Sequence, residues 1–176
     1  DKTGTLTHGE LRVRGVAWQP GVDEAQARAL ALRLALSSAH PVCRALVREG
    51  EHAAVPFADA RELRGLGVRA QTDAGEAVLG RHDLLAQHVH ELSPAPADFD
   101  GTCAGLALNG RLLAWFAFAD TLRPEAREAL DELRALRIAR EALVTGDRES
   151  VAQRLAREVG IETVVAQALP HDKLDY

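Results

Sequence analysis

Methionine is absent from all 176 residues, including position 1, and only two cysteines are present, Cys43 and Cys103. The missing initial methionine leads us to expect a fragment of a longer protein. The two cysteines lie far apart in the sequence, with no CxxC pair and no closely spaced histidine partners. This pattern indicates neither a zinc site nor a disulfide framework, so we expect two reduced thiols.

Long hydrophobic runs and an excess of positive charge are also missing. No stretch approaches the roughly 18 apolar residues of a membrane helix, and the nearest run, 112–119, has the length of a strand. No secretory signal is visible at the N-terminus. The formal net charge of −5 disfavours a nucleic-acid partner. What remains is a globular composition, 47% hydrophobic and 27% charged, of a size for one domain or two small ones.

The middle of the chain predicts a mixture of helices with short strands and hairpins. Residues 11–18 alternate in polarity and indicate a strand interrupted by a glycine. Helices are expected from the Asp23 cap to about residue 37, from Pro41 to Gly50, and over 81–90. Short strands are expected within 62–70 and at 76–80, with a surface loop at 93–101. Asn109-Gly110 between two apolar runs is a strong hairpin signal.

After Pro124 the pattern changes to helix, strand, helix, strand. A helix is expected to about residue 137, with one apolar face formed by Ala126, Ala129, Leu130, Leu133 and Leu136. A short strand at 142–144, a helix at 148–159, a strand at 162–166 and a turn at Pro170 follow. This order is typical of a parallel α/β sheet, in which ligands bind beyond the carboxyl ends of the strands.

Two polar segments carry the chemistry that such a sheet offers. Thr145-Gly146-Asp147 follows the 142–144 strand and presents a hydroxyl and backbone amides that suit a phosphate. The opening stretch DKTGTLT reads as a functional loop over 1–8, where the Asp1 carboxylate is a candidate nucleophile toward phosphorus. Such an attack on anionic ATP needs a cation, Mg²⁺ together with a lysine, and Lys173 follows the last strand.

DKTGTLT resembles the phosphorylation signature of P-type ATPases, and three later segments resemble that family in the expected order. DTLRPEA at 120–126 is similar to the return into the phosphorylation domain, VTGD at 144–147 to the phosphate-binding loop, and Pro-x-Asp-Lys at 170–173 to the segment with the active-site lysine. The resemblance implies an α/β fold: an incomplete Rossmann-like phosphorylation domain of haloacid-dehalogenase type (1–8 and 120–176), with an inserted α+β nucleotide-binding domain on an antiparallel sheet (9–119).

Within the family, the middle region resembles the heavy-metal transporting subgroup. SSAHP at 37–41 is similar to its Ser-Glu-His-Pro element, and GLGV at 65–68 to its glycine pair. The resemblance implies ATP contacts at His40, Pro41, Gly65 and Gly67. The subgroup carries Glu where this chain has Ala39 and another where it has Ala35, so we expect fewer polar groups around adenine.

The resemblance also implies a mechanism. Asp1 attacks the γ-phosphate of ATP, and Mg²⁺ is held by Asp1 and the backbone carbonyl of Thr3. Lys173 with Thr145 steadies the transferring oxygens, Gly146 allows close approach, and Asp147 orients the loop or the nucleotide. Lys2 is included among the catalytic residues as part of the opening motif. Hinges are expected at 8–12 and 117–123. Related phosphatases carry an acid–base Asp at the position of Thr3; its absence predicts a long-lived aspartyl-phosphate, which suits a pump.

Three function classes follow from these residues. The first is the ATP-binding and phosphorylation part of a heavy-metal pump at the cytoplasmic face of a membrane, with copper(I) as the first choice of cargo before zinc, cadmium or lead. The others are a soluble phosphatase of the same fold and a nucleotide-binding module without turnover. As partners we expect ATP and the pump's membrane helices and actuator domain. The fragment itself should be soluble, with little or no ATP turnover.

Overall fold

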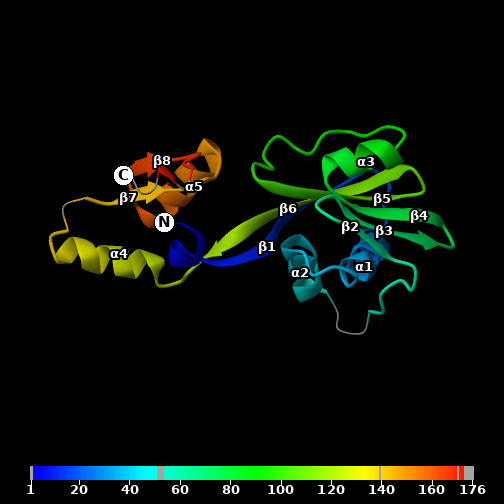
Figure 1. Cartoon of the computed structure of the whole chain (residues 1–176), viewed down its shortest axis with the longest axis horizontal. Helices are drawn as coiled ribbons and strands as arrows, with labels where there is room; N and C mark the ends of the chain where they lie inside the picture. The colour runs from blue at the N-terminus through cyan, green and yellow to red at the C-terminus, as the bar shows by residue number, and fades with distance from the viewer. Residues whose placement is uncertain (1, 51–53, 139, 170, 173–176) are drawn as a thin grey trace. The chain divides into compact units, whose positions relative to one another are not determined.

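A computed structural model of the chain describes residues 2–50, 54–138, 140–169 and 171–172 (Figure 1). The chain divides into two compact units: unit 1 comprises Asp1–Glu10 with Asp120–Tyr176, and unit 2 comprises Leu11–Ala119. Two long strands, β1 (Thr7–Trp18) and β6 (Arg111–Leu122), carry the chain across the unit boundary. The assignment of phosphorylation and nucleotide binding to the two parts stays a prediction.

Unit 2 is organised by one sheet with the strand order β1-β6-β5-β4-β3-β2. The inner strands are β5 (Thr102–Leu108), β4 (Gly75–Gly80) and β3 (Gly67–Thr72), and the edge strand is β2 (Arg61–Leu63). Strands β2 to β6 pair antiparallel. An antiparallel sheet with helices was the expected architecture of this region.

Helices cover both faces of this sheet. Helix α1 (Glu24–Ala35) begins where the Asp23 carboxylate accepts the amides of Ala25 and Gln26 at 3.0 and 3.1 Å. Helix α2 (Pro41–Glu49) follows, and the two pack on one face over a core that includes Leu34, Ala45, Val68, Leu79, Leu106 and Phe116. Helix α3 (His82–His88) packs with Trp115 in a second core that includes Val78, Leu84, Leu85 and Leu112.

The hairpin predicted at Asn109-Gly110 is confirmed. Both residues have positive φ, 45° and 76°, which matches a type I′ turn between β5 and β6. Leu106 pairs with Ala114 and Ala107 with Leu112, so Leu113 is the extra residue of a bulge in β6. The turn fixes the register that buries Trp115 and Phe116 on opposite faces of the sheet.

Unit 1 contains a short helical turn, Lys2–Leu6, then helix α4 (Ala126–Ala135), strand β7 (Ala142–Val144), helix α5 (Glu149–Val159) and strand β8 (Thr163–Val165). Strands β7 and β8 pair parallel, from Ala142 with Thr163 to Val144 with Val165, as the helix–strand alternation predicted. Their core is formed by Leu6, Ala126, Leu130, Leu143, Ala152, Ala156, Val159 and Ile161.

Several expected boundaries and faces in unit 1 were wrong. Residues 2–6 form a helical turn with non-helical dihedrals at Thr3 and Gly4, and β1 begins at Thr7, so 1–8 is not one loop. Helix α4 begins at Ala126, after Pro124. Its buried stripe is narrower than predicted, because Leu133 and Leu136 remain 41% and 75% exposed. Two parallel strands are too narrow to cover a full helix face.

The expected hinge segments, 8–12 and 117–123, lie largely within strands β1 and β6, not in loops. The glycine expected to interrupt the first strand, Gly15, lies inside continuous β1. Among the described residues, no helix is long and apolar enough to cross a membrane.

Candidate functional site

The N-terminal motif and the Thr-Gly-Asp loop meet in unit 1 through an ion pair. The Lys2 ammonium lies 2.5 Å from Oδ2 of Asp147, and the two side chains are 13% and 32% exposed. That carboxylate oxygen is buried. The ionic contact with Lys2 is therefore its main stabilisation among the described residues. Residues far apart in the sequence thus lie side by side, as two of the predicted site segments require.

The Thr145-Gly146-Asp147 loop is held by backbone hydrogen bonds at the carboxyl end of β7. Thr145 is only 3% exposed; its amide donates to Val165 of β8, and its carbonyl accepts the Ala168 amide, both at 2.9 Å. The Asp147 carbonyl accepts the Gln167 amide at 2.8 Å. Gly146 is exposed. The loop therefore has a fixed base and an open tip, the arrangement expected of a phosphate-binding loop.

A second group of contacts anchors the N-terminal motif, and sequence reasoning assigned it no role. Thr7 is fully buried, and its hydroxyl lies 2.5 Å from Oδ2 of Asp120 and 3.2 Å from the Lys2 carbonyl. Oδ1 of Asp120 accepts the Glu10 amide at 3.0 Å. The Arg123 amide donates to the Leu6 carbonyl at 2.9 Å. The sequence resemblance at DTLRPEA points to this segment, but only the fold shows which groups the Asp120 carboxylate contacts.

Two predicted residues, the nucleophile Asp1 and the lysine Lys173, lie outside the described residues, as does the Pro170 turn. Thr3 is exposed and has extended dihedrals (φ −70°, ψ 123°) that interrupt the helical turn. Within the described ranges no three His, Cys, Asp or Glu side chains gather as a metal site.

On unit 2, the residues predicted to contact the nucleotide lie around the start of α2 and the β2–β3 turn. His40 is exposed and caps α2, because its Nδ1 accepts the Val42 amide at 3.2 Å. Pro41 occupies the first turn, where its missing N–H costs nothing. His40 therefore has a structural role, and its other ring nitrogen, Nε2, is the atom left for a ligand.

The two glycines of the predicted pair differ in their surroundings. A Cβ on Gly65 would meet no atom within 4 Å, and its φ is +76°. A Cβ on Gly67 would lie 2.2 Å from the Leu79 carbonyl oxygen and 2.6 Å from the Gly80 Cα. Gly67 is thus required by close pairing with β4, whereas Gly65 leaves open space that a ligand can approach.

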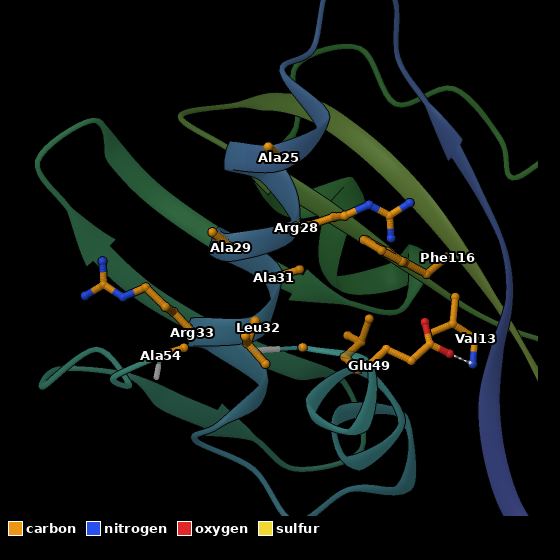
Figure 2. A pocket seen from close by; sticks show the side chains of 12 residues that line it. Val13, Ala25, Arg28, Ala29, Ala31, Leu32, Arg33, Glu49, Ala54 and Phe116 are labelled. Atoms are coloured by element: carbon orange, nitrogen blue, oxygen red, sulfur yellow. Dashed lines mark hydrogen bonds between the residues drawn. The ribbon is translucent and has the colours of Figure 1, made fainter. Parts of the chain in front are cut away.

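A hollow of unit 2 lies away from these four residues. A pocket of about 690 Å³ is bounded by α1, α2, Val13 and Phe116, and none of the four predicted nucleotide residues lines it (Figure 2). Its charged groups already contact the protein: Arg28 lies over the Trp18 ring, Arg33 over the Phe57 ring, and Glu49 accepts the Val13 amide. The pocket therefore does not supply the predicted nucleotide site.

Comparison with known proteins extends over nearly the whole chain. The family model of haloacid dehalogenase-like hydrolases matches residues 1–175. The chain is 32% identical over 178 residues to a zinc-transporting ATPase of Synechocystis sp. and 33% identical over 184 residues to a probable copper-exporting P-type ATPase V of Mycobacterium tuberculosis. It is 37% identical over 183 residues to a zinc/cadmium/lead-transporting P-type ATPase of Escherichia coli. Each match covers 99% of this chain but only 24% of the relative.

Solved structures agree with these relatives. The crystal structure of a zinc-transporting PIB-type ATPase superposes with a TM-score of 0.78 at 32% identity, covering 99% of this chain and 29% of that one. The catalytic domain of the CPx-ATPase CopB-B shares the fold, with a TM-score of 0.72 at 22% identity, covering 99% of this chain and 63% of that one. The predicted fold class and family are thereby confirmed: the chain belongs to the haloacid dehalogenase-like hydrolases and is homologous to the catalytic region of heavy-metal P-type ATPases.

Proposed function

We propose that the chain is the ATP-binding and phosphorylation part of an ATP-driven heavy-metal pump. The observation that carries the proposal is the Lys2–Asp147 ion pair, which joins the DKTGTLT motif to the Thr-Gly-Asp loop at the end of a parallel strand. Ligands of open α/β sheets bind at such strand ends.

In the proposed reaction a carboxylate oxygen of Asp1 forms a bond to the γ-phosphorus of ATP. The bond from that phosphorus to the bridging oxygen breaks, and ADP leaves with the electron pair. The products are an aspartyl-phosphate at Asp1 and ADP. Asp1 and Lys173 converge on the phosphate from the N-terminal motif and the last segment. Thr145 contributes its hydroxyl, and exposed Gly146 lets the phosphate approach the backbone.

Mg²⁺ supplies charge neutralisation between the carboxylate and the phosphates when it is bound. The Asp1 carboxylate and the Thr3 carbonyl would hold it, with water and phosphate oxygens as further ligands. Asp147 holds Lys2 in place, so the second residue of the motif keeps a fixed position beside the nucleophile.

Thr3 sets the lifetime of the intermediate. A neutral hydroxyl cannot accept a proton from water as a carboxylate does. The aspartyl-phosphate therefore persists until another group supplies a base. This favours a pump, which changes conformation between phosphorylation and hydrolysis, over a phosphatase.

The nucleotide-binding role belongs in this proposal to residues 9–119, with ATP beside His40, Pro41, Gly65 and Gly67. His40→Asn separates binding from folding, because Asn also caps helices well. We expect this variant to lose most ATP affinity and to keep its melting temperature within about 2 °C. His40→Ala should lose ATP affinity and also have a lower melting temperature, since removal of a helix cap costs about 1 kcal/mol.

The transported metal ion and the location at a membrane are proposed by analogy with the relatives. The chain spans about a quarter of the curated relatives it matches, whose names include zinc, copper, cadmium and lead. Copper(I) is the first choice and zinc the second. The remaining three quarters would contain the membrane helices and the actuator domain, with this part at the cytoplasmic face.

The test is phosphorylation of the full-length protein by ATP labelled at the γ-phosphate. We expect a labelled protein that survives acid and is released by hydroxylamine, as an acyl-phosphate is. Asp1→Asn should abolish the label, and Glu128→Gln, which changes an exposed carboxylate on α4, should retain most of it. Label that persists in Asp1→Asn would refute the nucleophile. Rapid loss of label in the absence of metal would favour the phosphatase.

A further inference from the structure

Glu62 lies on the helix-covered face of the unit 2 sheet, at its edge. It belongs to the edge strand β2 and pairs with Val68 of β3 in an antiparallel register. Directly opposed residues of two antiparallel strands point to the same face. Val68 is 1% exposed and packs in the core beneath α1 and α2. The Glu62 side chain therefore leaves the sheet on the side where α2 begins.

A hydrogen-bonded relay ties this carboxylate to the turn before α2. The Ser38 hydroxyl donates to Oε1 of Glu62 at 2.9 Å, and the His40 amide donates to the Ser38 oxygen at 3.1 Å. The negative charge also reaches the first turn of α2. Burial is the main cause that raises the pKa of the Cys43 thiol; the Ser38 hydrogen bond lowers it, and the Glu62 charge raises it further.

One oxygen of this carboxylate is left for a ligand. Glu62 is exposed, and among the described residues Oε2 accepts no hydrogen bond. Three residues further along the chain, Gly65 has open space where a side chain would lie. A fixed acceptor thus lies on the same short hairpin as Gly65 and is bonded, through Ser38, to the turn that carries His40.

We propose that Glu62 determines base specificity at the nucleotide site, accepting a hydrogen bond from the exocyclic amine of adenine through Oε2. The inference rests on the proposed nucleotide role of His40 and Gly65. Adenine carries an N–H donor at its six-position, whereas guanine carries a carbonyl oxygen there, which a carboxylate repels. Ala35 and Ala39, on the neighbouring helix end and turn, have no side-chain acceptor, whereas Glu62 has one.

The experiment measures the affinity of the chain for MgATP and MgGTP by titration calorimetry. Glu62→Gln keeps the size of the side chain and can donate to the guanine oxygen as well as accept from adenine. We expect the ratio of GTP to ATP dissociation constants to fall about tenfold, because a neutral amide accepts more weakly from adenine than a carboxylate does and can also donate to guanine. The matched control is Glu91→Gln, an exposed carboxylate outside this hairpin, which should leave the ratio unchanged.

Ser38→Ala provides a second variant that keeps the carboxylate and removes its tether. A positioning role predicts a smaller fall in the ratio, in the same direction, at an unchanged melting temperature. A purely structural contact would instead weaken both nucleotides equally. If Glu62→Gln leaves the ratio at the wild-type value while ATP still binds, the specificity role is wrong and the proposed function stands. If the wild-type chain binds neither nucleotide, both are wrong.

Discussion

Gly67→Ala should destabilise unit 2 severely, although the change adds a single methyl group. The new Cβ would lie 2.2 Å from the Leu79 carbonyl oxygen, about 1 Å inside an ordinary carbon–oxygen contact. Strand β3 would have to separate from β4 at the Gly67–Gly80 pair. Loss of two ladder hydrogen bonds costs about 2 kcal/mol, and backbone strain at a φ of +155° adds about 1–3. The expected loss is roughly 3–5 kcal/mol.

Gly65→Ala is the matched control, because it removes the other glycine of the same pair. Its Cβ meets nothing within 4 Å, and only the positive φ of +76° is unfavourable. That conformation costs an L-residue about 1–2 kcal/mol. The two variants should therefore differ by about 1–4 kcal/mol, and the middle of that range, about 2.5 kcal/mol, corresponds to roughly 5–10 °C in melting temperature for a chain of this length.

Urea unfolding followed by tryptophan fluorescence measures this difference directly. Both tryptophans, Trp18 and Trp115, belong to unit 2, so the signal reports the sheet that contains Gly67. The comparison needs equal slopes for the two variants, since a changed slope indicates a changed unfolded or native state. Equal unfolding midpoints for Gly67→Ala and Gly65→Ala would refute the packing argument.

Three further predictions concern single contacts. Thr7→Val should speed hydrogen exchange at the Arg123 amide roughly tenfold, because a hydroxyl–carboxylate hydrogen bond to Asp120, worth about 1.5 kcal/mol, is lost. Thr7→Ser should change the exchange rate little. Equal exchange rates in the wild type and both variants would contradict the anchoring role. Lys2→Met should lower the unfolding free energy by about 1 kcal/mol, since the ion pair with Asp147 is only partly buried. High salt should lower the unfolding free energy of the wild type but not that of the variant, because only the wild type has the ion pair. The raised pKa of Cys43 means that the folded state retains a proton that the unfolded state loses, so the unfolding free energy should fall as pH rises above 9.0. In thermal unfolding measured across this pH range, Cys43→Ala should show a smaller fall than the wild type.

The elements of this chain were largely predictable because their local signals are strong. Asp23 and Pro41 begin α1 and α2 as their capping chemistry predicts, and Asn109-Gly110 forms the predicted turn. The parallel β7–β8 pair follows from the alternation of helix and strand. These features depend on residues within a few positions of one another, so a single sequence contains the information needed.

Contacts between distant segments were less predictable. The apolar pattern of α4 predicts a broad buried face, yet Leu133 and Leu136 stay exposed because burial depends on what lies opposite. The roles of Thr7 and Asp120 depend on a hydrogen bond across 113 positions, which neither local pattern contains. The sequence predicted that Asp147 belongs to the site but not that Lys2 neutralises it.

The glycine pair shows why residue types alone are ambiguous at a binding site. The resemblance implies ATP contacts at both Gly65 and Gly67. In the fold the two glycines answer different requirements: Gly67 makes room for β4, and Gly65 alone leaves open space. A shift of one residue in the β2–β3 register would also turn Glu62 to the other face. The close packing that requires Gly67 therefore helps to fix the register that sets the proposed adenine acceptor, so packing and recognition depend on the same hairpin.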